Sequence, residues 1–293
     1  MGGLSFGFSK TGFQVKAYDI NKHVPDIFKQ NNIGNAEITD LSDTNLHLDS
    51  DIIIGGPPCR PWSSVNVTRR KKEHPEYGLV ESFFKIVLNS EPDVFLMENV
   101  PPVRNDESYV RCLNNMQEKY SVGNLLVRYS DFGAATKRRR LITFGFKNLN
   151  SNIFKDNLEK NKKISLKVGE VLEPYLNYAF KEFPDHEWPQ LKTIEKYKKN
   201  YETGKFGWYK LKWDEPAPSF GNIMKTYTLH PFSGENYPVR VISVREAMAI
   251  MGFPSTFEFP LDMGHTIKYQ MVADAVSPIF SLSCASAIRE TLK

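Results

Sequence analysis

One cysteine of this chain lies in a stiff turn that could present a nucleophile. Residues 55–63 read GGPPCRPWS, so Cys59 stands between prolines and follows an isoleucine-rich run at 52–54. Proline fixes the backbone angle φ, which makes the turn rigid. A thiolate held on a rigid turn can attack an electrophilic carbon. An isolated cysteine in a proline-rich loop can also be inert, so the turn alone leaves both interpretations open.

An acid and two arginines could act beside that cysteine. Glu98 comes at the end of the apolar run VFLMEN, and KRRR places Arg138 and Arg140 two residues apart before LITFGF. If a strand begins at this point, the i, i+2 spacing puts both arginine side chains on one face. A carboxyl group beside a thiol can hold or protonate a ring nitrogen, and arginine gives paired donors to a carbonyl or a phosphate. Taken singly, these residues could equally be a strand-end acid and a solvated basic turn.

The segments that must position these groups alternate between strand-like and helix-like patterns. Four apolar runs rich in strand formers cover residues 13–20, 51–56, 93–100 and 139–146. Residues 78–92 carry apolar side chains at helical spacing and predict a crossover helix between the second and third runs. This alternation predicts an α/β fold with a parallel sheet and helices on both of its faces. Ligands of such sheets collect beyond the carboxyl ends of the strands, where Cys59 and Glu98 would meet.

The second half of the chain has a different texture. After Phe146 the composition shifts to Asn, Lys and Glu with scattered aromatic residues, and this pattern lasts to about Arg240, which predicts a second lobe. The run SVREAMAIMGFP then predicts a helix that is closed by Gly-Phe-Pro. Residues 271–292 predict a last helix that is kinked at Pro278 or begins there.

Composition excludes several classes of protein. With 293 residues, 41% of them hydrophobic, the chain can bury one large domain or one domain with a smaller lobe. Its three cysteines show no paired metal-ligand spacing, so we expect reduced thiols in a cytosolic protein rather than a disulfide framework or a zinc site. Cys112 and Cys284 lie in helix-like contexts and are expected to be buried. We expect no membrane span, which needs about 18 apolar residues, and the N-terminus lacks a signal pattern.

Basic charge is unevenly distributed along the chain. The net charge is only +4, but residues 69–72 and 196–213 hold much of the positive charge. This distribution is compatible with a polyanionic partner. From Lys192 to Trp213 lysines alternate with aromatic side chains, which could contact nucleic acid or simply form the core of a small lobe.

Five motifs occur in order along the chain: GGPPCRPWS, MENV, TKRRR, SVREAMAIMGFP and MVADAVSP. Together they resemble the motifs of the DNA cytosine-5 methyltransferases of prokaryotic or phage restriction-modification type. The resemblance implies a Rossmann-like S-adenosylmethionine-dependent methyltransferase sheet with an inserted small target-recognition lobe. It divides the chain into a catalytic and cofactor-binding domain (1–146), a target-recognition lobe (147–239) and C-terminal helices that complete the catalytic domain (240–293).

The resemblance also implies a reaction and a role for each catalytic candidate. Cys59 would add to C6 of a cytosine that is flipped out of a specific duplex DNA sequence, because C5 is too poor a nucleophile to take a methyl group directly. Glu98 would bind N3 and the exocyclic amine, Arg140 would contact O2, and Arg138 would support the site. S-adenosylmethionine would then give its methyl group to C5, a base would remove the C5 proton, and the cysteine would leave.

Cofactor residues follow from the same resemblance, and no metal is implied. The glycines match the end of a glycine turn, the acids match ribose and adenine contacts, and the apolar residues match the walls of an adenine pocket. The matching residues are Gly2, Gly3, Asp19, Ile20, Glu37, Ile38, Pro58, Leu79, Asp274 and Ala275. Ile20 and Leu79 could equally be ordinary core residues.

The sequence departs from the family pattern in several places. The family opens with an apolar strand before its glycines, whereas this chain begins MGG, so that strand either lies upstream or is lost. Arg60 and Thr136 stand where glutamines are usual. ADAV replaces Gly-Asn-Ala-Val, so Ala273 predicts a helical φ at that position. Asp274 in place of asparagine could accept a hydrogen bond but not donate one.

The implied partner is double-stranded DNA, with a cognate restriction endonuclease as a possible genetic partner. We expect a cytoplasmic monomer whose lobe at 147–239 reads DNA, and residues 69–78 could close over the flipped base or form a solvated loop. One alternative is a catalytically weak DNA-binding protein or one part of a split enzyme. A third interpretation is methylation of cytosine in tRNA, which uses the same chemistry.

Overall fold

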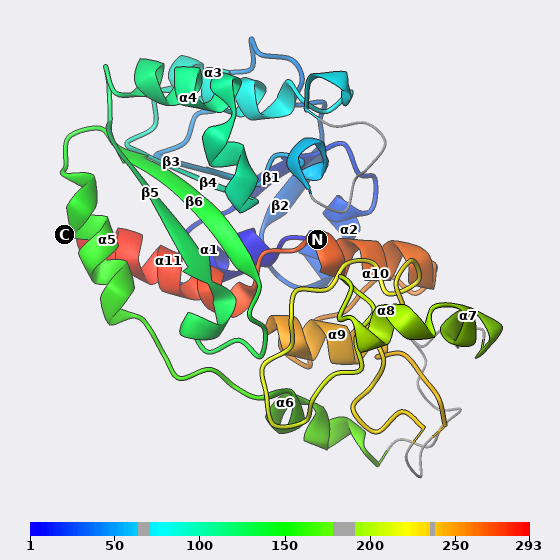
Figure 1. Ribbon diagram of the computed structural model, residues 1–293. Helices are drawn as coiled ribbons and strands as arrows, with labels where there is room; N and C mark the ends of the chain where they lie inside the picture. Colours follow the sequence, from blue (N-terminus) through cyan, green and yellow to red (C-terminus); the bar gives the residue numbers. More distant parts are fainter. Residues whose placement is uncertain (64–70, 178–190, 235–237) are drawn as a thin grey trace.

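A mixed sheet forms the centre of the computed structural model, which describes residues 1–63, 71–177, 191–234 and 238–293 (Figure 1). Its four strands are Ile52–Gly55 (β3), Val94–Asn99 (β4), Ser121–Arg128 (β5) and Arg139–Phe146 (β6). They lie in the order β3–β4–β6–β5. The strands predicted at 51–56, 93–100 and 139–146 are therefore confirmed, as is the α/β class.

The direction of β6 makes the prediction of an all-parallel sheet wrong. β3 and β4 are parallel, but β6 runs antiparallel to β4 on one side and to β5 on the other. Only residues 129–138 join β5 to β6, and a parallel connection needs about a dozen residues or more. The short link therefore forces these two strands to be antiparallel. The sequence pattern does not predict β5, because Gly123 and Asn124 interrupt its apolar residues.

A separate parallel pair of strands comes first in the chain. β1 (Lys16–Asp19) pairs with β2 (Asn35–Ile38), and Asp19 lies opposite Ile38. The helix α1 (Gly3–Lys10) precedes this pair, and α2 (Val24–Gln30) connects its two strands. The strand predicted at 13–20 is confirmed, and the pair ends at two of the predicted cofactor residues.

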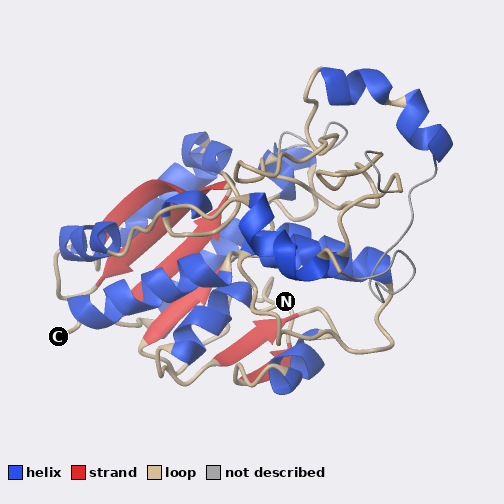
Figure 2. Ribbon diagram, turned by 90° about the horizontal axis from the view of Figure 1, so that it is seen from below, coloured by secondary structure: helices blue, strands red, loops and turns tan. Residues whose placement is uncertain are grey.

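Helices lie on both faces of the central sheet (Figures 1 and 2). Strand β4 requires cover on both faces of the sheet, because all six of its side chains are buried. Phe95 and Met97 pack into one apolar cluster with helices α3 and α4, whereas Leu96 packs into a second cluster that includes Phe280 of α11. The helices around the sheet are Leu79–Ser90 (α3), Glu107–Met116 (α4), Ser151–Lys160 (α5) and Pro278–Thr291 (α11).

The late helices confirm the sequence predictions. Ser243 and Glu246 form a capping box at the start of α9 (Val244–Met251), and Gly252 ends the helix at φ 85°. Ala273 lies within α10 (His265–Asp274), as its helical φ requires, and α11 begins at Pro278 rather than being kinked there.

One stretch contradicts the expectation that no segment resembles a membrane span. Residues His265–Thr291 are long and apolar enough to cross a membrane by length and composition. Most of this stretch is buried inside the fold, where it supplies α10 and α11. A core helix passes the same test, so this stretch is explained by packing.

The second lobe lies beside α9 and α10 (Figure 1). Trp208 is buried there, and its ring lies 4.4 Å from that of Tyr197, 5.6 Å from that of Tyr201 and 6.0 Å from that of Tyr227. Trp208 is thus the buried centre of an aromatic cluster whose three tyrosines are half-buried. Its helices are Val168–Leu172 (α6), Leu191–Lys196 (α7) and Lys198–Glu202 (α8). Short 3-10 turns span Glu173–Tyr175 within the lobe and, elsewhere, Arg60–Trp62, Lys71–Glu73, Pro101–Asn105 and Tyr129–Asp131.

Candidate active site

Four strand ends meet at one edge of the central sheet. β3 leads into the turn that carries Cys59, β4 ends just after Glu98, and β5 ends next to Tyr129. Because β6 is antiparallel to β4 and β5, its first residues, including Arg140, lie at this same edge. A parallel β6 would have placed its first residues at the opposite edge. The reversal of β6 is therefore what brings the arginines to the acid.

Glu98 and Arg140 form a buried ion pair at this edge. Nε of Arg140 lies 2.6 Å from Oε1 of Glu98, and each side chain is only 9% exposed. The Tyr129 hydroxyl donates to the same oxygen at 3.2 Å. Burial is the largest single influence and opposes the charge of Arg140, but the attraction of Glu98, together with smaller contributions from Tyr129 and Cys59, raises the pKa of Arg140 overall. The guanidinium therefore stays charged, and the carboxylate keeps two donors on Oε1.

Arg138 lies on the same buried face as Arg140, whereas Arg139 between them is exposed. This arrangement confirms the face predicted from the i, i+2 spacing. Nη2 of Arg138 donates to the carbonyl of Ala273 at 2.6 Å, and Nη1 donates to that of Phe220 at 3.4 Å. Burial, followed by repulsion from Arg140, lowers the pKa of Arg138 to about 10. Arg138 thus ties the end of α10 and the returning lobe segment to the sheet edge.

Cys59 is the partly exposed cysteine, and Cys112 and Cys284 are buried as predicted. It precedes a 3-10 turn, in which the amide of Trp62 donates to the Cys59 carbonyl at 3.1 Å. Burial raises the pKa of the thiol, Arg140 acts against that rise, and Glu98 adds to it. The charges of Arg140 and Glu98 therefore both reach the sulfur. The thiol rests in its protonated form and must lose its proton before it can attack.

The Cys59 turn is anchored by an acid that the sequence does not single out. Asp106 accepts from Nε1 of Trp62 at 2.9 Å and from the hydroxyl of Tyr77 at 2.7 Å. Arg60 adds an ion pair with Glu76 at 2.8 Å. Trp62 and Tyr77 stand on either side of residues 64–70, so one carboxylate joins both flanks of that segment. The contacts cross 44 and 29 residues of sequence, which no local pattern reveals.

The predicted cofactor residues at the ends of β1 and β2 combine carboxylates with exposed apolar side chains. Ile20 is 71% exposed and Ile38 is 60% exposed, so neither is a core residue. Asp19 accepts from the amide of Asn21 at 2.8 Å, and Glu37 pairs with Lys16 at 2.8 Å. Exposed apolar side chains suit the faces of a purine ring, and carboxylates accept from ribose hydroxyls. These residues fit the adenosine part of S-adenosylmethionine.

The predicted glycines lie where a side chain would not fit. Gly2 has φ 81°, and a Cβ there would come 2.8 Å from the ring of Phe28. A Cβ on Gly3 would collide with the carbonyl of Val276, which follows Ala275. The start of α1 therefore lies against the link between α10 and α11.

The remaining cofactor candidates lie around the turns at the edge of the central sheet that carries Cys59 and Glu98. Pro58 and Leu79 are half-buried, Asp274 is exposed, and Ala275 is buried. The charge of Asp274 acts on the Cys59 thiol, which places this carboxylate within electrostatic reach of the sulfur. Among the residues that the structure describes, no group of three or more His, Cys, Asp and Glu side chains could hold a metal ion.

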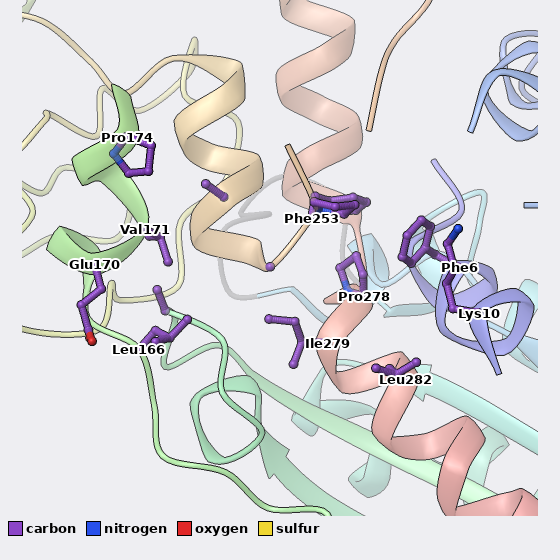
Figure 3. A pocket seen from close by; sticks show the side chains of 14 residues that line it. Phe6, Lys10, Leu166, Glu170, Val171, Pro174, Phe253, Pro278, Ile279 and Leu282 are labelled. Carbon is purple, nitrogen blue, oxygen red and sulfur yellow. The ribbon is translucent and has the colours of Figure 1, made fainter. Parts of the chain in front are cut away.

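An apolar groove of about 430 Å³ lies elsewhere, between α1, α6, α9 and α11 (Figure 3). Phe253, Ile279 and Leu282 line it, and Lys10 and Glu170 are its charged lining residues. It includes none of the predicted site residues and no nucleophile. The groove therefore does not compete with the sheet edge as the reactive centre.

The second lobe presents lysines to solvent. Lys192 and Lys196 on α7 and Lys198 and Lys199 on α8 are all exposed. The helix α5 falls within the predicted lobe at 147–239, yet it packs against α11 and the central sheet. Part of the basic stretch at 69–72 lies outside the described residues, as does the start of the loop predicted to close over the base.

Comparison with known proteins identifies the family. The model of C-5 cytosine-specific DNA methylases matches residues 1–290. The type II methyltransferase M.FnuDI of Fusobacterium nucleatum is 27% identical, over 99% of this chain and 92% of that protein. M.NgoPII of Neisseria gonorrhoeae is also 27% identical, over 100% of this chain and 94% of that protein.

Solved structures agree on the fold. The Dnmt2 methyltransferase of S. pombe superimposes with a TM-score of 0.79 at 17% identity, covering 100% of this chain and 96% of that one. The Entamoeba histolytica methyltransferase EhMeth gives a TM-score of 0.72 at 15% identity, with 100% and 96% covered. The fold is thus that of the S-adenosylmethionine-dependent methyltransferases. The chain belongs to the C-5 cytosine-specific DNA methylase family and is a methyltransferase that uses S-adenosylmethionine.

Proposed function

We propose that this enzyme methylates C5 of a cytosine extruded from a specific duplex DNA sequence, through a covalent bond between Cys59 and C6. The observation that carries the proposal is the buried pair of Glu98 and Arg140 beside the Cys59 turn. A nucleophile, an acid and a cation at one edge match the requirements of adding a thiolate to a pyrimidine ring.

The residues have distinct tasks in this reaction. Cys59 passes its proton to the Glu98 carboxylate and bonds to C6, and the ring nitrogen N3 takes that proton from Glu98. Arg140 contacts the ring carbonyl O2, where its charge stabilises the developing negative charge. Arg138 supports the site indirectly, because its hydrogen bonds to Ala273 and Phe220 hold the neighbouring segments in place. Elimination of the thiolate after a base removes the C5 proton restores the aromatic ring.

S-adenosylmethionine supplies the methyl group to C5 when it is bound. We assign its adenosine to Asp19, Ile20, Glu37 and Ile38, whose exposed apolar and acidic side chains suit a purine nucleoside. We also assign Gly2 and Gly3, which let the start of α1 pack closely against Phe28 and Val276, and Pro58, Leu79, Asp274 and Ala275 complete the assignment toward Cys59. No metal ion takes part in this proposal.

A stacked cytosine cannot reach Cys59, so the target must leave the duplex at a cost of a few kcal/mol. We assign the compensating DNA contacts to the lobe at 147–239, where the lysines of α7 and α8 can neutralise phosphates. Trp208 is buried, and Tyr197 and Tyr201 pack against it, so we assign these aromatic residues to the packing of the lobe rather than to base contacts. Because α5 packs on the central sheet, the DNA-reading part lies after that helix.

The biological setting follows from the relatives. M.FnuDI and M.NgoPII are named type II methyltransferases, so we place this enzyme in a restriction-modification system with a cognate endonuclease. We further propose that it acts as a monomer in the cytoplasm, where its DNA substrate lies.

Transfer of labelled methyl groups tests the proposal. Purified enzyme, labelled S-adenosylmethionine and mixed-sequence duplex DNA should give label at C5 of cytosine, and Cys59→Ala should abolish it while Cys112→Ala should not. If the label enters tRNA and not duplex DNA, the substrate is tRNA and the proposal of a DNA substrate is wrong. Tight DNA binding without transfer would instead support a DNA-binding protein and refute the enzyme.

A further inference from the structure

The hydroxyl of Tyr129 contacts the acid of the proposed reaction, although no motif of the sequence points to it. It donates to Oε1 of Glu98 at 3.2 Å, and the Tyr129 side chain is 0% exposed. A residue this deeply buried cannot touch a substrate. Any effect on the reaction must therefore act through Glu98.

The position of Tyr129 is fixed on several sides. Its ring stacks on that of Phe280, with centroids 5.2 Å apart and planes at 27°. Its amide donates to the carbonyl of Arg138 at 3.0 Å, and its own carbonyl accepts from the amide of Ala134 at 3.2 Å. The hydroxyl therefore has one orientation available, toward Glu98.

The hydroxyl is also a permanent donor. Burial, followed by the negative charge of Glu98, raises the pKa of Tyr129 well above its usual value. The phenol is therefore protonated at neutral pH. Glu98 therefore always faces a donor at this oxygen.

The two oxygens of Glu98 have different surroundings. Oε1 accepts from both Tyr129 and Arg140, which uses the two lone-pair directions of a carboxylate oxygen. Oε2 lies on the side of Gly56, where a Cβ would stand 3.6 Å from it. Gly56 begins the turn that carries Cys59. Oε2, which lacks these two donors, therefore faces the turn that carries Cys59.

We propose that Tyr129 is a positioning residue that occupies Oε1 of Glu98, so that Oε2 is the atom that gives a proton to the target base. This inference rests on the proposed function. As the S–C6 bond forms, the C5=C6 electron pair shifts to C4=C5, and the C4=N3 pair moves to N3. The proton that the Cys59 thiol loses passes to Oε2 of the Glu98 carboxylate, and N3 then takes it from Oε2, which leaves Glu98 as a carboxylate again. When Arg140 turns to the base carbonyl, Tyr129 remains as the donor that holds Oε1.

The test is Tyr129→Phe, which removes the hydroxyl and keeps the ring that stacks on Phe280. Tyr120→Phe is the matched control, since the buried Tyr120 hydroxyl donates to the carbonyl of Pro92 at 2.9 Å, away from Glu98. Single-turnover methyl transfer is measured against pH, together with KM for DNA and thermal unfolding. We expect Tyr129→Phe to lower the rate about tenfold with KM within about twofold, because one hydrogen bond to a charged group is lost.

The pH profile separates positioning from a structural role. The limb that reports Glu98 should move to higher pH in Tyr129→Phe, because the ionised carboxylate has lost a donor. It should stay in place in Tyr120→Phe. In a Glu98→Gln background, Tyr129→Phe should cause little further loss of rate. If Tyr129→Phe does not fold, 3-fluorotyrosine at position 129, a stronger donor, should move the same limb to lower pH.

Two failures can be told apart. If the wild-type chain transfers no methyl group to DNA, the proposed function fails. If it transfers methyl groups through Cys59, but Tyr129→Phe matches Tyr120→Phe in rate and pH profile, the positioning role of Tyr129 is refuted alone.

Discussion

At the edge of the central sheet Glu98 is held by two donors and almost fully buried, whereas Ile20 and Ile38 at the ends of β1 and β2 are 71% and 60% exposed. The proposed catalytic edge is tied together by contacts between strands, and its geometry exists without a ligand. The β1–β2 ends offer an uncovered apolar surface, to which we assign the cofactor. The comparison indicates that substitutions at the edge should change the chemical step, and substitutions at the β1–β2 ends should change cofactor affinity.

The largest expected effect comes from the acid. Glu98→Gln keeps the shape of the side chain but removes the proton that N3 receives, so we expect the methyl-transfer rate to fall about 100-fold or more. DNA affinity should change by less than about threefold, because Glu98 lies inside the sheet edge. Single-turnover kinetics and filter binding check the two quantities. Equal losses in rate and affinity would show that Glu98 has a structural role.

The Asp106 anchor should have the next largest effect. Asp106→Ala leaves Trp62 and Tyr77 without their common acceptor, which should lower the free energy of unfolding by about 1–3 kcal/mol. It should also slow methyl transfer by about tenfold, because the turn that carries Cys59 loses its anchor. Urea unfolding and single-turnover kinetics measure both, with the exposed Glu118→Ala as the control. A stable variant with unchanged rate would show that the anchor does not position Cys59.

At the proposed cofactor surface we expect a change in affinity and no change in rate. Ile38→Ala should weaken binding of S-adenosylhomocysteine about fivefold, since roughly 1 kcal/mol of apolar contact with the adenine is lost. The rate at saturating cofactor should not change. Calorimetry checks the affinity, and Ile164→Ala is the control because that side chain is 93% exposed elsewhere on the chain. A loss of rate without a loss of affinity would move Ile38 to the catalytic edge.

The smallest expected effect is on the pH at which the Cys59 thiol reacts. Burial raises the pKa of Cys59, so its alkylation by iodoacetamide should rise with pH and reach its midpoint above that of a free cysteine. The buried Cys112 and Cys284 should not react in the folded protein. Mass spectrometry of the modified peptides measures each cysteine. A midpoint below that of free cysteine would mean that Arg140 controls the thiol more strongly than burial does.

Local sequence signals account for much of the fold. The isoleucine run gives β3, the capping box of Ser243 and Glu246 gives α9, and Pro278 gives the start of α11. The direction of β6 follows from the ten residues between β5 and β6, a signal that can be read only once β5, which the sequence pattern does not predict, is known. That signal matters most, because it decides whether the arginines and Glu98 share an edge.

The rest of the site depends on contacts between distant residues. Tyr129 meets Glu98 across 31 residues, and Asp106 meets Trp62 across 44. Neither contact leaves a periodic pattern, because each joins single side chains from different strand ends and turns. The cysteine, the acid and the arginines can be predicted from motifs, whereas the groups that hold them require the folded chain.

The central claim is that Cys59 forms a bond to the base, and trapping tests it most directly. Duplexes with 5-fluorocytosine at the target position, incubated with the enzyme and S-adenosylmethionine, should give a covalent complex, since fluorine cannot leave as the proton does. Peptide mapping should place the DNA on Cys59, and Cys59→Ala should form no complex. Methyl transfer to ordinary DNA without any trapped complex, or a complex through another residue, would contradict the account.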